Sequence, residues 1–438
     1  MSQAYVSRYN VFLADPRTGQ RVVFNTLSHG IAALHDELHS SLELAVPGER
    51  ADAAVGSLDE EADLIRIGVL VPPEIDEIAK LRYRRFNAKF GTGHSPLTVL
   101  LTTGCNFACS YCYQDNLASD EDLSMERWDV LRTFIEEHVA ANRVHTLKVD
   151  LFGGEPLMNL PVLLEAAASL KRLEGGRFRV VNRLITNGSL LDRKLMGKLE
   201  SVVDSIGITI DGPESRHNQR RPFKGGGASY TPVLKALRLA LESEVPHVAL
   251  RSNLHLDELG TVRQFLGDLA GELPNLAKLS LSLSEIGPSL SETRGSSCYT
   301  PDIAAENEIR KLWHEAYDLG FSFSGVDFPQ GVCVAELPNT MVVDPQLRVF
   351  KCLTQLPDRH SARILPGGIL EPVSRSWYEI PNRDPECVYD CKFGPICHGG
   401  CPVLPERESE SEVCPLEVGF ESQIPDMVSL RLRVLENA

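Results

Sequence analysis

The alternation of strand-like and helix-like segments after about residue 97 constrains the fold most. Short apolar runs recur six times, separated by amphipathic patterns such as MERWDVLRTFIEEHVA. Runs that are apolar on both faces and alternate with helices indicate βαβ units and a parallel sheet. They predict an α/β fold built on a partial (β/α)6 barrel, whose functional residues follow the strand ends. The six runs are LTVLLTT, LKVDLF, FRVVNRLIT, SIGITI, VALRSNL and LAKLSLSL.

Two further domains are expected beside the barrel, which would span 96–325. In 1–95, YNVFLAD and QRVVFNT flank a PRTG turn and predict two strands, followed by a helix over IAALHDELHSSLELA and a short strand pair in IRIGVLVPP. This mixture predicts a winged-helix-like α+β domain. The segment 326–438 has weak periodicity and seven cysteines, so we expect a loop-rich iron–sulfur domain that is stabilised by bound clusters.

The net charge of −16 argues against nucleic acid as a general partner, because phosphate binding needs clustered Lys and Arg. No apolar run reaches the roughly 18 residues that would span a membrane, and no secretory signal is evident. We therefore expect a cytoplasmic chain without a nucleic-acid or membrane partner. The basic and aromatic stretch LRYRRFNAKF (81–90) is expected to be a surface helix whose Arg stems cover apolar neighbours, with a peptide or nucleic-acid contact as the alternative.

Three cysteines stand close together at the end of the first barrel strand. Cys105, Cys109 and Cys112 have the spacing C-x3-C-x2-C. One short loop of this kind can hold three irons of a [4Fe–4S] cluster and leave the fourth iron open to another ligand. The alternative is a zinc site, although structural zinc usually takes four protein ligands.

This motif, with Tyr111 before its last cysteine, resembles the radical S-adenosylmethionine (SAM) superfamily. The resemblance implies that SAM binds the open iron and is cleaved to a 5′-deoxyadenosyl radical, with an electron donor such as flavodoxin or ferredoxin. Further family-like motifs follow the later strands: FGGEP (152–156), TNG (186–188), TIDGP (209–213) and RSN (251–253). The residues that the resemblance assigns to SAM are Tyr111, Gly153, Gly154, Glu155, Asn187, Thr209 and Arg221.

The later cysteines resemble the SPASM extension of peptide-modifying radical SAM enzymes, which implies two auxiliary [4Fe–4S] clusters. The first would be held by Cys333, Cys352 and Cys401, and its fourth ligand would be Cys298 unless that iron is open. The chain departs from the usual pattern in a C-x3-C spacing and in Leu347, where Gly is common. Zinc is the alternative for 387–401. The ligands of the second cluster would be Cys387, Cys391, Cys397 and Cys414.

These features favour an enzyme that oxidatively crosslinks a ribosomally made peptide. The alternatives are a sulfatase-type maturase that forms formylglycine and a non-catalytic iron–sulfur electron-transfer protein. The domain 1–95 is expected either to capture a leader peptide along the exposed edge of its YNVFL and QRVVF strand pair or merely to cover the barrel. No catalytic acid or base stands out among the polar residues expected near the cavity, which are Tyr113, Asp115, Glu214 and His217.

Overall fold

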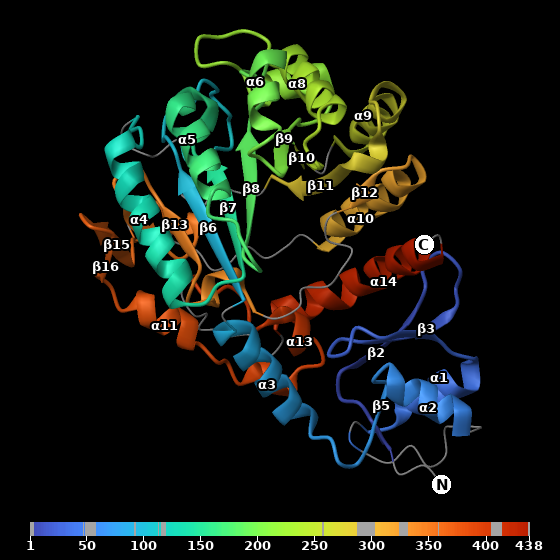
Figure 1. Ribbon diagram of the computed structural model, residues 1–438. Helices are drawn as coiled ribbons and strands as arrows, with labels where there is room; N and C mark the ends of the chain where they lie inside the picture. The colour runs from blue at the N-terminus through green and yellow to red at the C-terminus, as the bar shows by residue number, and fades with distance from the viewer. Residues whose placement is uncertain are drawn as a thin grey trace.

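The computed structural model places an α/β body beside a smaller N-terminal module (Figure 1). Three residues considered above, Tyr113, Asp115 and Cys298, lie outside the described part of the chain. The structure describes residues 4–46, 48, 58–91, 93–112, 114, 120–255, 258–286, 303–323, 332–357, 359–403 and 414–436.

The six predicted strands all form, and they lie side by side in chain order with every neighbouring pair parallel. The α/β prediction is therefore confirmed. In the described residues the sheet stays open rather than closing into a full barrel. These strands are β6 (His94–Leu100), β7 (Thr146–Phe152), β8 (Arg179–Thr186), β9 (Ser205–Thr209), β10 (His247–Leu254) and β11 (Leu279–Glu285), with β12 (Ser322–Phe323) added beside β11.

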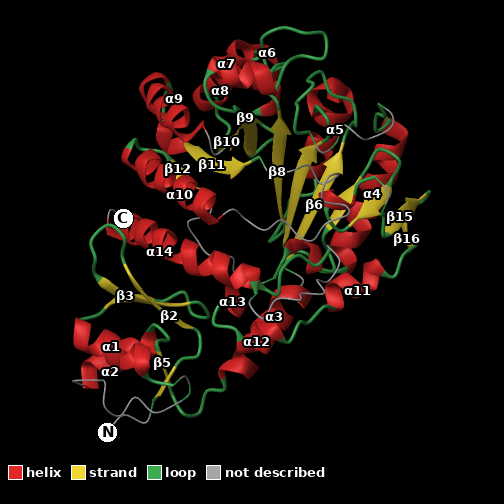
Figure 2. Ribbon diagram, turned by 180° about the vertical axis from the view of Figure 1, so that it is seen from behind, coloured by secondary structure: helices red, strands yellow, loops and turns green. Residues whose placement is uncertain are grey.

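Helices connect these strands and cover the sheet (Figure 2). Their apolar faces supply much of the main core, in which Trp128, Leu163 and Leu237 are fully buried. Side chains accept hydrogen bonds at two helix starts, Ser124 from the Arg127 amide and Asp192 from the Leu195 amide. The helices are α4 (Met125–Ala141), η1 (Pro156–Asn159), α5 (Leu160–Lys171), α6 (Arg193–Leu199), α7 (Glu214–Arg220), α8 (Tyr230–Glu242), α9 (Leu259–Glu272), η3 (Leu276–Lys278) and α10 (Ile303–Asp318).

The C-terminal segment is more regular than its sequence suggests. Its first strand pairs in parallel with β6, and three more strands extend the same sheet in antiparallel order. Strands of three or four residues are too short to produce a clear period-two pattern. The elements are η5 (Val334–Glu336), β13 (Met341–Val343), β14 (Arg348–Phe350), η6 (Leu353–Gln355), β15 (Ala362–Leu365), β16 (Ile369–Pro372), α11 (Ser376–Asn382), α12 (Cys387–Asp390), α13 (Gly394–Cys397) and α14 (Pro415–Glu436).

The N-terminal module departs from expectation in two places. The start of the expected helix, Ile31–Ala33, is instead a strand that pairs with the second predicted strand. The expected strand pair in IRIGVLVPP supplies only one strand, which pairs with the chain start, because its first residues end a helix. The elements are β1 (Tyr5–Val6), β2 (Asn10–Ala14), β3 (Arg21–Asn25), β4 (Ile31–Ala33), α1 (Asp36–Leu44), α2 (Leu58–Arg66), β5 (Leu70–Val71) and α3 (Glu77–Phe90).

Both faces of the sheet β2–β3–β4 are covered. Val23 packs with Leu38 and Leu42 of α1 on one face. On the other face Phe24 belongs to a cluster with Phe393 and with residues of α14. The N-terminal module therefore packs directly against the C-terminal segment. None of the described helices is both long and apolar enough to cross a membrane.

The helix over 81–90 forms as predicted, but two of its cations are not on the surface. Arg85 is 3% exposed and Lys89 is 6% exposed, and both reach the buried carboxylate of Glu336. Tyr83 and Phe86 are among the exposed side chains of this helix. The prediction of a surface helix whose Arg stems cover apolar neighbours was thus wrong for Arg85 and Lys89. Both side chains are buried because they form ion pairs with Glu336 of the C-terminal segment.

Candidate functional site

The loop after β6 brings three thiols and one guanidinium into the same space. Burial raises the pKa of the Cys109 thiol to about 12, the charges of Cys112 and Cys105 act in the same direction, and Arg221 opposes them. The Phe107 amide donates to the Cys105 sulfur at 3.4 Å. Backbone N–H groups that point at sulfur stabilise thiolates, and thiolates are the form that binds iron.

The Gly153–Gly154 turn after β7 is pressed against this cysteine loop. The Gly154 amide donates to the Thr102 carbonyl at 2.9 Å, and the Glu155 amide donates to the Gly104 carbonyl at 2.8 Å. Gly153 has φ of 145°, and a Cβ atom there would lie 2.2 Å from the Thr102 oxygen. Only glycine permits this approach of two backbones.

The Glu155 carboxylate is fully buried and joins the ends of two strands. Its Oε1 accepts from the Thr186 hydroxyl at 2.7 Å and from the Leu157 amide at 3.0 Å, and its Oε2 accepts from the Asn187 amide at 2.7 Å. Burial raises its pKa, whereas these three hydrogen bonds lower it. The side chain thus holds the turn in place, and its assignment to SAM stays a prediction.

Asn187, from the TNG motif, links the end of β8 to the cysteine loop. Its Nδ2 donates to Oδ1 of Asn106 at 2.8 Å and lies 4.0 Å from the Cys105 sulfur. Its Oδ1 accepts from the Ser189 amide at 2.9 Å. An amide beside a cysteine sulfur is one of the groups by which proteins adjust iron–sulfur sites.

Tyr111 points into a buried polar network. Its hydroxyl donates to Asp211 and accepts from Arg221 Nη1 at 2.6 Å and from Asn253 Nδ2 at 3.1 Å. Arg221 Nε is buried and has no hydrogen-bond partner among the described residues. Thr209, the last residue of β9, is half-buried. The structure therefore brings Tyr111 and Arg221 together at the sheet's carboxyl edge.

Asp211 is the member of this network that sequence reasoning did not single out. It is fully buried, and its Oδ1 accepts from the Asn253 amide at 2.9 Å. Its own amide donates to His217 Nδ1 at 3.2 Å. The available signal was its place inside the TIDGP motif at a strand end, where an acidic residue would face the site.

The C-terminal cysteines gather in two groups. Burial raises the pKa of Cys333, and the charges of Cys401 and Cys352 add to this effect. Burial likewise raises the pKa of Cys397, with a further contribution from Cys414 and Cys391. The charge of Cys414 also raises the pKa of Cys387. The cysteines within each group therefore lie close enough to influence one another.

The backbone around these thiols suits iron–sulfur ligands. Burial raises the pKa of the Cys397 thiol, and the backbone at Gly399 and Gly400 opposes that rise. The Phe393 amide donates to the Cys391 sulfur at 3.4 Å. No three His, Cys, Asp or Glu side chains in the described ranges come close enough to hold one metal ion. A cubane keeps its thiolates further apart than a single ion does, because irons and sulfides separate them.

Residues 99–259 match the family model of the Radical SAM superfamily. This part of the chain is a radical SAM domain. The matched residues contain the cysteine loop and each of the motifs at the ends of β7, β8, β9 and β10.

Two curated relatives of the domain are serine-type anaerobic sulfatase-maturating enzymes. The protein from Klebsiella aerogenes is 22% identical over 339 residues, which cover 71% of this chain and 80% of the relative. The protein from Bacteroides thetaiotaomicron is 28% identical over 138 residues, 31% of this chain and 33% of the relative. The matched region thus spans most of the Klebsiella aerogenes protein and a third of the Bacteroides thetaiotaomicron protein.

Two solved structures share the fold. The structure of anSMEcpe with bound AdoMet has a TM-score of 0.59 at 17% identity, covering 78% of this chain and 100% of that one. Streptococcus suis SuiB bound to the precursor peptide SuiA has a TM-score of 0.50 at 14% identity, covering 91% and 95%. At these identities the likeness concerns the fold alone.

Proposed function

We propose that this chain is a radical SAM maturase that oxidatively crosslinks a ribosomally made peptide. The observation that carries the proposal is the backbone contact between the Gly153–Glu155 turn and the loop that bears Cys105, Cys109 and Cys112. A [4Fe–4S] cluster and SAM bound there would supply a carbon-centred radical that removes a hydrogen atom from the substrate. Arg221, with one buried nitrogen unpartnered in the described residues, would bind the SAM carboxylate.

We further propose that the later cysteines hold two auxiliary clusters. Cys333, Cys352 and Cys401 would serve the first, whose fourth ligand is either Cys298, outside the described residues, or absent. The amide hydrogen bond to the Cys391 sulfur supports the second auxiliary cluster. Such centres accept single electrons, which a net two-electron oxidation of a peptide requires. A flavodoxin or ferredoxin would exchange electrons with the enzyme. The ligands of the second auxiliary cluster would be Cys387, Cys391, Cys397 and Cys414.

A peptide substrate is supported by what the fold neighbours bind. SuiB was solved with its precursor peptide SuiA, and anSMEcpe was solved with AdoMet and the Cp18Cys peptide. In the N-terminal module β4 pairs with β3, so of the expected strand pair YNVFL and QRVVF only the first, β2, is an edge of the described sheet. The edges of the described three-stranded sheet are β2 and β4. We propose that a leader peptide adds beside β4 as a further strand.

Formylglycine formation is the second candidate, and the sulfatase-maturating relatives favour it. Coverage favours a maturase that acts on a precursor peptide. The whole of anSMEcpe aligns with only 78% of this chain, whereas SuiB aligns with 91%. A larger part of this chain, therefore, has a counterpart in the peptide-bound SuiB structure.

Anaerobically reconstituted protein, given SAM and dithionite, is expected to release 5′-deoxyadenosine, measured by liquid chromatography. Cys105→Ala should abolish this release and lower the iron content by one cluster only. With a precursor peptide, a crosslink appears in mass spectrometry as the loss of two hydrogens without reactivity toward a hydrazide. A hydrazide-reactive aldehyde would identify formylglycine instead. No 5′-deoxyadenosine from protein with intact clusters would leave the non-catalytic electron-transfer alternative.

A further inference from the structure

Helix α3 carries positive charge from the N-terminal module into the C-terminal segment. Glu336 is fully buried, and its Oε2 lies 3.1 Å from Lys89 Nζ and 3.9 Å from Arg85 Nη2. Arg383 adds a third cation, with Nη1 3.4 Å from Oε1 of the same carboxylate. The described part of this cluster thus joins residues that are about 250 to 300 positions apart in the chain.

The cations outnumber the acids in this cluster. The second carboxylate, Asp384, lies 3.3 Å from Arg85 Nε, and its side chain is 53% exposed. Tyr389 donates its hydroxyl to Asp384 at 2.7 Å. Neither terminal nitrogen of Arg85 hydrogen-bonds to a described residue. Three cations against two carboxylates leave one positive charge in excess, although the whole chain carries −16. A buried excess of charge is costly unless an opposite charge lies nearby.

The cluster contacts the chain close to cysteines of the first ligand set. Glu336, the ion-pair partner of Lys89, follows Cys333 by three residues. Arg383 Nη1 lies 3.5 Å from the carbonyl of Gly400, next to Cys401. Both cysteines belong to the first proposed ligand set.

The same cations also contact residues close to the second ligand set. Asp384, which lies 3.3 Å from Arg85 Nε, precedes Cys387 by three residues. Arg383 also donates to the Gly399 carbonyl, two residues after Cys397. The cations of α3 and Arg383 therefore contact residues that lie within three positions of cysteines in both sets.

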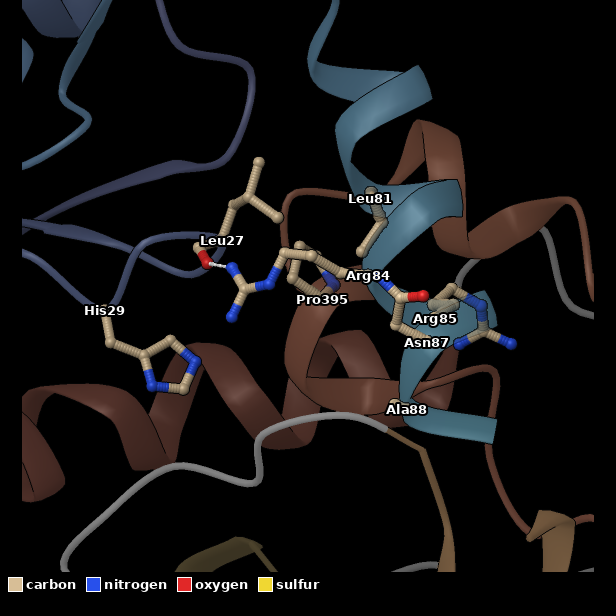
Figure 3. Close-up of a pocket in the computed structure, with 8 residues that line it drawn as sticks. All are labelled: Leu27, His29, Leu81, Arg84, Arg85, Asn87, Ala88 and Pro395. Atoms are coloured by element: carbon tan, nitrogen blue, oxygen red, sulfur yellow. Dashed lines mark hydrogen bonds between the residues drawn. The ribbon is translucent and has the colours of Figure 1, made fainter. Parts of the chain in front are cut away.

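Neighbouring arginines of α3 point to opposite sides. Figure 3 shows Arg84 turned toward the N-terminal module, where it donates to the Leu27 carbonyl beside a cavity of about 300 Å³. Arg85 points away from Leu27 in the same view, on the side where its ion-pair partners Glu336 and Asp384 bind it. Arg84 therefore offers a matched control, because it has the same chemistry on the same helix without a contact to the acids.

We propose that Arg85 and Lys89, together with Arg383, supply the counter-charge of the two auxiliary clusters and raise their reduction potentials. This inference rests on the proposed function, because it requires those clusters. A cluster held by thiolates becomes one unit more negative when it takes up an electron, so nearby positive charge stabilises the reduced form. The role of these residues is electrostatic and not catalytic. The helix that links the N-terminal module to the barrel would thus set how readily the clusters accept electrons.

The test is a redox titration followed by electron paramagnetic resonance. The full chain carries Cys105→Ala, Cys109→Ala and Cys112→Ala, so that only auxiliary clusters give a signal. At the potential where this parent protein is half reduced, Arg85→Met or Lys89→Met should lower the ratio of reduced to oxidised cluster about tenfold, or about 59 mV for one electron. Glu336→Gln should shift the ratio in the opposite direction. Arg85→Lys should restore the parent ratio, and Arg84→Met should leave it unchanged.

The outcomes separate the two proposals. Shifts of opposite sign for the cation and carboxylate variants support the inference, because misfolding would not produce them. Unchanged ratios in variants with full iron and sulfide overturn it, as does an equal shift in Arg84→Met. Iron too low for two clusters in the parent protein overturns the auxiliary-cluster proposal itself, and this inference with it.

Discussion

The Gly154 amide donates a hydrogen bond of 2.9 Å to the carbonyl of Thr102, which places the turn after β7 directly on the loop after β6. The contact joins two backbones, so it depends on the small size of the residues more than on their chemistry. The position of the three thiols relative to the neighbouring strand ends therefore depends on glycine at this turn.

Gly154→Ala is expected to displace the cysteine loop. The added Cβ atom would lie 2.2 Å from the Gly104 carbonyl oxygen, a separation that the backbone must relieve by moving. We expect a loss of about 1–3 kcal/mol in stability and a lower iron content at the first cluster. Gly197→Ala in α6 is the control, because no atom lies within 4 Å of its Cβ position. Equal iron content in the two variants would contradict this account of the turn.

Tyr111→Phe is expected to destabilise the chain. The change removes the hydroxyl that accepts from Arg221 and Asn253, and it leaves Oδ2 of the buried Asp211 without the hydroxyl donor. An unsatisfied buried polar group costs about 1–3 kcal/mol. Urea unfolding should show this loss. Tyr83→Phe, at a side chain that is 68% exposed, should unfold like the wild type.

Stability is expected to fall as the pH drops from 7 to 5. Burial lowers the pKa of His217 to about 3, and the nearby Arg221 lowers it as well. The folded chain thus keeps this imidazole neutral, whereas the unfolded chain protonates it below its ordinary value near 6.5. Because the unfolded state binds the extra proton, about 2 kcal/mol should be lost over this range. Urea unfolding at both pH values measures it. His217→Asn, which keeps an acceptor for the Asp211 amide, should lack that share of the loss.

Ala33→Pro is expected to prevent leader-peptide binding to the N-terminal module. The Leu34 amide donates to the Arg21 carbonyl, and the Asn25 amide donates to the Gly30 carbonyl. Because successive amides of a strand point to opposite sides, the Ala33 amide points away from β3. Proline at position 33 removes the N–H group that a docked peptide would use, and it leaves the hydrogen bonds between β3 and β4 in place. Ala32→Pro instead removes an inward donor and should lower the melting temperature. Undiminished peptide binding by a folded Ala33→Pro chain, measured by fluorescence anisotropy, would show that β4 is not the docking edge.

The parallel sheet was predictable because its signal is local and repeated. Each of the six strands is an apolar run of five to eight residues followed by an amphipathic helix, and burial on both faces requires that composition. The strand β4 was missed because Ile31, Ala32 and Ala33 also suit a helix. These residues form a strand because they pair with β3, and a sequence of three residues does not reveal that pairing.

The sequence predicts which side chains would bind a cluster and SAM, because cysteine spacing and glycine at a strand end are local properties of the chain. Only the tertiary structure decided that Glu155 joins two strands, that Asp211 anchors Tyr111, and that α3 carries cations toward the later cysteines. Lys89 and Glu336 stand far apart in the chain and interact at 3.1 Å only because the N-terminal module packs against the C-terminal segment. The strength of such an ion pair depends on its distance and burial, and folding alone sets both.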